Sequence, residues 1–251
     1  MKEKRILKIK TAAILAGGES SRFQQVTRFK AMAQIAGESL INRLIREFLQ
    51  LGVENIIVAL NAKMSDLDFV NDKNLSMLKH PQVKKIFVST PSSMHTLYEV
   101  FSKQTHLTNL THMTHLLVSM VDTIVKSDEL KSFYDSTSLL NPHESLLLTN
   151  HFIDDEKPLT VKLDSSGQFI SAFAVPLVED EAIVTSGMYC FSSSIYPLLE
   201  QAVNSGQEKL RNFLAQMLKN NYAIKNYTIA KTIDVDRPED LEVARIFLRC
   251  D

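Results

Sequence analysis

The chain has 251 residues, of which 45% are apolar and 23% are charged, as in an ordinary soluble globular protein. Its 28 lysines and arginines nearly balance its 29 aspartates and glutamates. The net charge of -1 excludes a global attraction to nucleic acid or to anionic membranes. The two cysteines, Cys190 and Cys250, show neither a disulfide pattern nor the spacing of a zinc site. Because Lys8 and Lys10 interrupt the apolar N-terminus, we expect no signal peptide, no membrane span and a cytoplasmic location.

The first half of the chain alternates between predicted strands and helices. Residues 11–16 predict a buried strand that leads into the glycine loop of "AAILAGGESSRF" (12–23). Apolar residues at helical spacing predict helices over 39–52, where Gly52 is the stop, and over 94–103. Short β-branched and apolar runs predict further strands at 55–60, 84–90, 115–120 and 145–150. This alternation predicts a Rossmann-like three-layer α/β/α fold with a mostly parallel mixed sheet.

The second half has a different pattern, with more turns and fewer regular alternations. Two strands around a Ser-Gly turn are predicted over 158–175, and another strand over 182–192. Helical patterns and a β-rich segment follow at 193–203, 208–218, 222–235 and 238–250. No long linker interrupts the chain, so we expect a single domain over 1–251. Within it, we expect two halves, residues 11–150 and 151–251, of which the second completes a site begun in the first.

Candidate ligand-binding residues follow several predicted strands at the edge where parallel α/β sheets bind ligands. The glycine loop lacks both the G-x-x-x-x-G-K-[ST] pattern of a P-loop and the G-x-G-x-x-G dinucleotide fingerprint. Its backbone N–H groups and serine hydroxyls, with Arg22 and Lys30 nearby, suit a triphosphate. The alternative is a tight strand-to-helix turn that holds no ligand.

The segment "LAGGESSRF…RFKAMAQIAGESLINRLI" resembles the signature of the sugar-1-phosphate nucleotidyltransferases, a superfamily that includes the nucleotide-diphospho-sugar pyrophosphorylases. That signature is a strand, a Gly-rich loop ending in Arg, and then a Lys before a G-x-x-L-I-x-R helix start. Here the helix start is formed by Gly37, Leu40, Ile41 and Arg43. The resemblance continues through "VSMVDTIVK", "TSGMYCF" and "IDVDRPEDLEVAR", and so extends over residues 11–249.

The resemblance implies transfer of a nucleoside monophosphate from a triphosphate to a phosphorylated acceptor, with a sugar 1-phosphate favoured, in nucleotide sugar biosynthesis. It implies nucleotide binding by Ala16, Gly17, Gly18, Ser20, Ser21, Ser93 and Thr96. Arg22 would hold the departing β- and γ-phosphates, Lys30 would stabilise charge at the α-phosphate, and Asp122 and Asp236 would hold Mg²⁺. A phosphate monoester with a pKa near ~6 is largely dianionic at neutral pH, so the acceptor needs no protein base.

The carboxylates also have structural interpretations. Asp122 has the position of a turn or capping residue, and Asp240 that of a first-turn helix charge. Arg237 stands where the family has Thr, next to Pro238 at the predicted first helical position. Because Arg has no side-chain acceptor for the first N–H groups of a helix, Asp236 could be the cap instead of a metal ligand.

The acceptor side departs from the family pattern. Many sugar-phosphate enzymes have Glu-Lys-Pro after the mid-chain hairpin, and that Lys binds the acceptor phosphate; this chain has Ala-Val-Pro at 174–176. Lys162 in the same hairpin could substitute for it. Gly187 and Tyr189 match a strand that often lines the acceptor pocket, although a Tyr at that spacing is more often core.

Two further groups of polar residues have structural alternatives. Ser93 could contact the nucleotide. Equally, Ser92 or Ser93 could cap the start of the helix that follows. His106, His112 and His115 could suggest a metal, but a solvated loop is favoured.

Two other functions stay open. The "GGESSR" loop favours a molybdenum-cofactor-type guanylyltransferase, whereas the spacing to Lys30 and the large second half oppose it. Phe29 in place of the usual Pro, with the missing acceptor Lys, leaves open a non-catalytic nucleotide-binding regulatory domain. The expected partners are a nucleoside triphosphate and a phosphorylated small molecule, with a homo-oligomer possible and neither nucleic acid nor membrane involved.

Overall fold

The computed structural model describes residues 8–18, 21–23, 25–107, 113–152, 158–176 and 182–249. A nine-stranded mixed sheet forms its centre. Its strands are β1 (Thr11–Ala16), β4 (Asn55–Asn61), β5 (Val83–Val88), β6 (His115–Met120), β8 (Glu144–Asn150), β9 (Thr160–Leu163), β10 (Ile170–Phe173), β11 (Ile183–Ser192) and β12 (Ala223–Ile229). Two-stranded pairs are formed by β2 (Gln34–Ile35) with β3 (Glu38–Ser39), and by β7 (Thr123–Ile124) with β13 (Ile233–Asp234).

The strand directions in the sheet change at β11. On one side β6, β1, β4 and β5 run parallel to one another. β11 lies antiparallel to β6, β8 and β9, and β12 then pairs parallel to β8. β9 and β10 form the hairpin expected around the Ser-Gly turn, in which Gly167 has a φ of +70°. The expected mostly parallel mixed α/β fold is confirmed.

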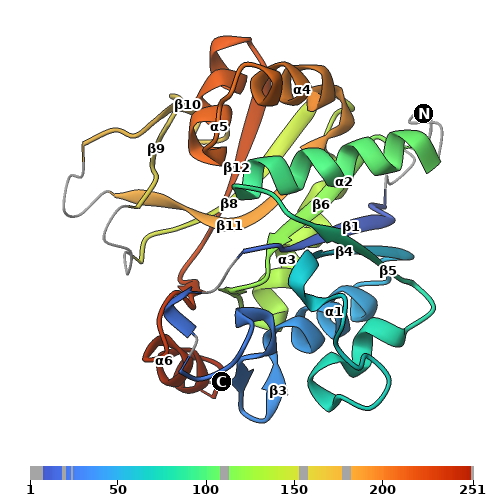
Figure 1. Cartoon of the computed structure of the whole chain (residues 1–251). Helices are drawn as coiled ribbons and strands as arrows, with labels where there is room; N and C mark the ends of the chain where they lie inside the picture. The colour runs from blue at the N-terminus through green and yellow to red at the C-terminus, as the bar shows by residue number, and fades with distance from the viewer. Residues whose placement is uncertain are drawn as a thin grey trace, which may run out of the picture.

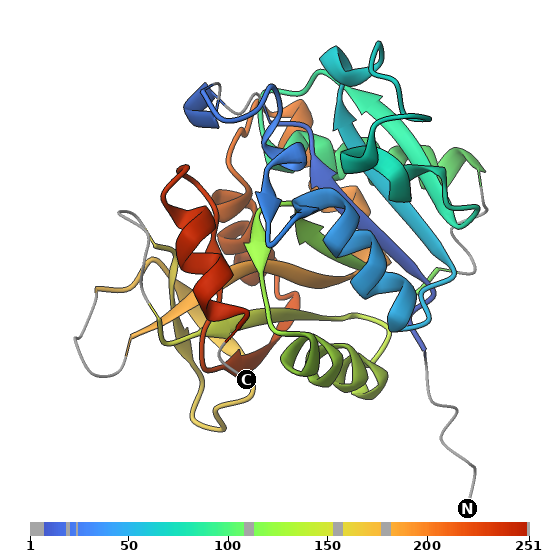
Figure 2. The ribbon, with the colours of Figure 1, turned by 90° about the horizontal axis from the view of Figure 1, so that it is seen from below.

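Helices cover both faces of the sheet. They are α1 (Leu40–Gln50), α2 (Ser93–Leu107), α3 (Ser127–Ser136), α4 (Tyr196–Asn204), α5 (Leu210–Lys219) and α6 (Asp240–Phe247). Figure 1 shows α2, α4 and α5 on one face, and Figure 2, seen from below, shows α1, α3 and α6 on the other. Alternate strand side chains enter the two cores: Ile14 of β1 packs with the α1 side and Leu15 with the α2 side.

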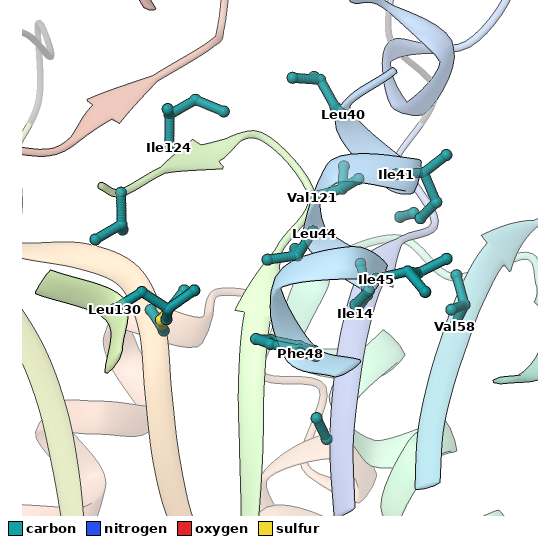
Figure 3. Packing of buried hydrophobic residues seen from close by; sticks show 14 of the residues in the cluster. Ile14, Leu40, Ile41, Leu44, Ile45, Phe48, Val58, Val121, Ile124 and Leu130 are labelled. Carbon is teal, nitrogen blue, oxygen red and sulfur yellow. The ribbon is translucent and has the colours of Figure 1, made fainter. Parts of the chain in front are cut away.

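Helix α1 illustrates how the sequence determines the packing. Ser39 caps its start by accepting a hydrogen bond from the Asn42 N–H, and the chain leaves it through Gly52 at a φ of +79°. Its apolar face is directed at the parallel strands, as Figure 3 shows for Leu44 and Ile45 against Ile14. Each fully buried Leu, Ile or Phe contributes about 1.5–3 kcal/mol to folding.

Most predicted elements agree with the structure to within a few residues, but three features differ. α3 lies in a segment for which the sequence predicted no element. β7 and β13 are too short to leave a periodic pattern. The last helix starts at Asp240, so Pro238 lies before it and not in its first turn. Among the described residues, every helix is too short or too polar to cross a membrane.

Candidate functional site

A cleft of about 630 Å³ opens where β1 and β6 end, between the helices of the two faces. Its lining includes six of the residues singled out from the sequence, namely Arg22, Ser93, Asp122, Gly187, Tyr189 and Asp236. A smaller hollow of about 330 Å³ lies beside Thr114, His143 and Tyr196. The residues that line this hollow include no Asp, Glu, Lys or Arg, so it offers neither a carboxylate for Mg²⁺ nor a Lys or Arg for phosphate.

The glycine loop lies directly against the start of α2. The Asn61 side-chain amide donates to the Gly17 carbonyl at 2.8 Å. A Cβ on Gly17 would lie 2.9 Å from Val88 Cγ2 and 3.2 Å from Thr96 Oγ1, so only glycine permits this approach. Gly18 is exposed and has open space around its Cα. Neither glycine lines the cleft, which this segment reaches through Arg22.

The other predicted nucleotide-binding residues fall in different places. Thr96 is buried, shares a hydrogen bond with Thr90 and donates to the Ser92 carbonyl, so it supports the loop from behind and does not line the cleft. Ser92 accepts from the His95 N–H at the start of α2, and both Ser92 and Ser93 line the cleft, so capping and exposure to ligand coexist. Ala16 is the buried last residue of β1. Ser20 and the side chain of Ser21 lie outside the described part of the chain.

Lys30 lies between the two predicted metal ligands. Its Nζ donates to Asp122 Oδ2 at 2.7 Å and to Asp236 Oδ1 at 2.8 Å, although 206 positions separate Lys30 from Asp236. The 3₁₀ turn Lys30–Met32 carries the lysine, and its side chain is only 15% exposed. Burial opposes the ammonium charge, but the two carboxylates outweigh it and raise the pKa of Lys30. The ammonium is therefore fully charged at neutral pH.

The short β7–β13 pair brings the two aspartates together. Asp234 pairs with Thr123, and the Val235 N–H donates to the Asp122 carbonyl at 3.0 Å. Asp122 leaves the end of β6, and Asp236 follows β13 by two residues. The backbone ladder therefore fixes the separation of carboxylates that are far apart in sequence.

The capping interpretation of Asp236 is wrong. The carboxylate of Asp240 accepts from the N–H groups of Asp236 and Arg237, at 2.8 and 2.6 Å, and so stabilises the approach to α6. The carboxylate of Asp236 accepts instead from Lys30. Asp240 also lies in the first turn of α6, as expected from the sequence.

Asp234 forms a third carboxylate in this group. The Thr123 hydroxyl donates to its Oδ1 at 3.2 Å. Enclosure by the cleft walls, followed by the charges of Asp122 and Asp236, raises the pKa of Asp234. Its surface is still open to solvent. Solvent therefore weakens the effect of burial on the pKa of Asp234. The repulsion from the neighbouring carboxylates is the main cause of the raised pKa. A cation in the cleft would relieve this repulsion.

Gly187 and Tyr189 lie on the wall formed by β11. A Cβ on Gly187 would lie 2.1 Å from Thr123 Oγ1 and 3.0 Å from Met120 Cγ, so glycine is needed beside the segment that carries Asp122. Tyr189 is 6% exposed and stacks on Phe191 with ring centroids 5.2 Å apart, yet it also lines the cleft. Its core and site interpretations are therefore both consistent with the structure.

Arg43 anchors the same region from α1. Its side chain is buried, and Nη2 donates to the Val125 carbonyl at 2.7 Å. Burial lowers the pKa of Arg43, although the guanidinium stays charged at neutral pH. The last residue of the G-x-x-L-I-x-R motif thus stabilises the segment that follows Asp122.

On the acceptor side, the structure does not bring Lys162 to the cleft. Lys162 is an exposed residue of β9 and is absent from the cleft lining. The basic side chains on this side are Lys209 and Arg211, at the start of α5. Neither Lys209 nor Arg211 was predicted from the sequence as a site residue, because a Lys and an Arg in a helical pattern are typical of any solvated face.

The histidines do not form a centre in the described residues. His115 opens β6, is buried, and its Nε2 lies 2.9 Å from the Glu144 carbonyl oxygen, so the loop interpretation is wrong for it. The side chain of His106 and all of His112 lie outside the described part of the chain. Across the described residues, no group of three or more His, Cys, Asp or Glu could hold a metal ion by itself. Cys190 is buried in β11.

Comparisons with known proteins identify the family of this chain. The sequence matches the family model of the MobA-like NTP transferase domain over residues 12–221. The bifunctional IPC transferase and DIPP synthase of Aquifex aeolicus (strain VF5) is 23% identical over 243 residues. The match covers 96% of this chain and 52% of that protein, so the chain spans about half the length of this relative.

Solved structures share the fold. The inositol-1-phosphate CTP transferase of T. maritima superposes with a TM-score of 0.73 at 19% identity, over 96% of this chain and 95% of that chain. The UDP-glucose pyrophosphorylase from Acinetobacter baumanii gives a TM-score of 0.71 at 17% identity, over 95% and 93% of the two chains. At these identities the likeness shows the architecture alone.

Proposed function

The chain belongs to the family of MobA-like NTP transferase domains, and we propose that it transfers a nucleoside monophosphate from a triphosphate to the phosphate of a sugar or cyclic polyol, releasing pyrophosphate. The observation that carries this proposal is the contact of Lys30 with Asp122 and Asp236, two aspartates that line one cleft with Arg22 from the end of the glycine loop. The acceptor class is supported by relatives named for inositol 1-phosphate and UDP-glucose.

The aspartates fit a divalent cation. Two carboxylates that converge on one ammonium can converge equally on a metal, and Mg²⁺ prefers a few carboxylates with water and phosphate oxygens as its other ligands. Asp122 and Asp236 would hold Mg²⁺, which would reduce the repulsion between the triphosphate and an anionic acceptor. The ammonium of Lys30 competes with the metal for these oxygens, so metal binding would release Lys30 toward the phosphates.

The residues of the chain position the reactants. The backbone of Gly17 and Gly18 and the guanidinium of Arg22 bind the triphosphate. Lys30 stabilises the charge that develops on the α-phosphate oxygens. An oxygen of the acceptor phosphate attacks the α-phosphorus, the bond from the α-phosphorus to the bridging oxygen of the β-phosphate breaks, and pyrophosphate leaves. No proton has to move, so positioning and charge account for the catalysis.

A steady-state assay of pyrophosphate release tests the proposed function. The four common nucleoside triphosphates are paired with glucose 1-phosphate, with inositol 1-phosphate and with molybdopterin, each with Mg²⁺ and with EDTA. We expect turnover with at least one pair, and only with Mg²⁺. Turnover with none contradicts the proposal, and nucleotide binding without turnover favours a regulatory domain. GTP transfer restricted to a molybdopterin acceptor favours the guanylyltransferase.

Competition between Lys30 and the metal gives a test that does not depend on activity. Mg²⁺ alone should raise the melting temperature of Lys30→Met more than that of the wild type, because the substitution leaves both carboxylates to the metal. Lys162→Met, on the exposed β9, serves as the control and should respond as the wild type does. An equal shift in Lys30→Met and the wild type would contradict competition.

A further inference from the structure

We propose that Lys209 and Arg211, at the start of α5, form the acceptor-phosphate subsite of this chain. The inference rests on the proposed function, because it assigns the second substrate of the same reaction. The ligand would be the phosphate monoester of a molecule rich in hydroxyl groups. Two cations match the double negative charge that such a monoester carries at neutral pH.

The charges that line the cleft are divided between its two sides. One side holds all the acidic lining residues, which are Asp122, Asp234, Asp236 and Asp240, together with Arg22 and Arg237. The lining residues at α5 carry positive charge only, on Lys209 and Arg211. Figure 1 shows α5 and α6 on opposite sides of β11. A metal–triphosphate would be bound on the acidic side. The basic side then remains for a second anion, which must enter the same cleft to reach the α-phosphorus.

Tyr189 lies within reach of both sides. Burial raises the pKa of Tyr189, the carboxylates of Asp234 and Asp122 raise it further, and the guanidinium of Arg211 opposes the rise. The phenol therefore experiences the acidic group and the basic residue together. Tyr189, Arg211 and the carboxylates line one cleft, so an anion held at Arg211 would share that space with a triphosphate bound at the acidic side.

The β9–β10 hairpin does not provide the cation. It contributes Pro158 and Leu159 to the cleft lining, and both are uncharged. The segment 174–176, after β10, is absent from that lining, as is Lys162. Among the described residues on this side of the cleft, the positive charge for an acceptor phosphate therefore comes from α5.

A wall of buried polar side chains adjoins the same space. The Asn150 amide donates to Ser186 Oγ at 3.0 Å and to Thr232 Oγ1 at 2.9 Å, and the two hydroxyls lie 3.2 Å apart. One hydroxyl donates to the other, so one of the two O–H protons remains for another acceptor. All three residues line the cleft and are at most 5% exposed. This wall suits the hydroxyl groups of a sugar or cyclic polyol.

Kinetics on single variants test the assignment. Lys209→Ala and Arg211→Ala should each raise the KM for the active sugar or polyol phosphate about tenfold or more, the loss expected for a charged hydrogen bond. The KM for the nucleotide should stay unchanged, because the triphosphate lies on the other side. Lys219→Ala, at the far end of α5, and Lys162→Ala are matched controls that should leave both KM values unchanged.

A binding measurement separates this inference from the proposed function. Calorimetric titration with glucose 1-phosphate and with inositol 1-phosphate is carried out on the wild type and on Arg211→Ala. If the wild type shows no turnover but binds one of them in an Arg211-dependent way, the proposed function fails and the subsite stands. If the wild type is active and both α5 variants keep its acceptor KM, or change the nucleotide KM equally, the subsite is overturned.

Thr232→Val tests the polar wall separately. Removal of this hydroxyl should weaken binding of the sugar or polyol phosphate and leave binding of inorganic phosphate unchanged, because inorganic phosphate has no hydroxyl-rich body. Equal losses for both ligands, or no loss for either, would overturn the role of the wall.

Discussion

The two sides of the cleft differ in the charged groups that they present. On the Lys30 side, contacts between distant segments bring opposite charges together: Lys30 contacts both aspartates, and Asp240 accepts hydrogen bonds from the backbone that leads to α6. On the α5 side, the lining residues Lys209 and Arg211 carry positive charge only, and both are exposed. Under the proposed function, the first side would serve the chemistry, which needs fixed geometry, and the second would bind the acceptor phosphate.

The largest expected effect belongs to the Lys30 side. Lys30→Ala and Asp122→Ala should each lower kcat about a hundredfold or more, the loss expected for a group that stabilises transition-state charge. Pyrophosphate release measures kcat, and circular dichroism verifies the fold. If either variant retained full activity, the assigned role would be wrong. If instead the α5 variants lowered kcat, while Lys30→Ala and Asp122→Ala lowered only the affinity for substrate, the roles assigned to the two sides of the cleft would be reversed.

A smaller effect is expected at Gly187, where the walls of the cleft meet. Gly187→Ala would push Thr123 away from Asp234, since the new Cβ would lie 2.1 Å from Thr123 Oγ1. We expect a loss of about 1–3 kcal/mol in unfolding free energy, as in other overpacked sites, with a fall in kcat. Urea denaturation measures the unfolding free energy, and the activity assay measures kcat. Gly18→Ala, which has nothing within 4 Å of its new Cβ, should keep wild-type stability.

Arg43 should affect stability more than chemistry. Arg43→Met leaves the Val125 carbonyl without its donor and should cost about 1–3 kcal/mol of unfolding free energy. Lys131→Met on α3 removes an exposed pair with Asp135 and should cost less than about 1 kcal/mol. Urea denaturation compares them, and equal losses would show that Arg43 is not a special anchor.

The smallest effect concerns Cys190. Burial raises the pKa of its thiol, so the folded protein holds it neutral and unreactive. In a Cys250→Ser background, a thiol reagent should label the chain only after unfolding. The unfolded thiol ionises near pH ~8.5, so the contribution of Cys190 to stability should be complete below that pH and decline above it. Rapid labelling of the native protein would contradict this burial.

Much of the fold was predictable because apolar periodicity is a local signal. β1, β4, β6 and α1 follow from runs of buried residues, and their boundaries differ from prediction by a residue or so. α3 was missed because its buried residues are only Leu130, Phe133 and Tyr134 in an otherwise polar segment. β7 and β13 leave no pattern, since each has two residues and exists only through the other.

The site residues show the same division. Lys30, Asp122 and Asp236 were named from motif order, and the structure brings them together. Lys162 and Thr96 were named in the same way but do not line the cleft, because the hairpin register and the fit of Gly17 against α2 place them elsewhere. Motif order specifies which loops reach the sheet edge, and it does not specify where each side chain points.

The sequence by itself determined the alternation of strands and helices, the glycine loop at the end of β1 and the family to which the chain belongs. These depend on local periodicity and on residues close together in the chain. Only the tertiary structure decided that Asp240, and not Asp236, stabilises the approach to α6, and that the start of α5 brings Lys209 and Arg211 to the cleft. The reason is physical. These contacts depend on the pairing of β7 with β13 and on helix packing across β11, which no single segment of sequence encodes.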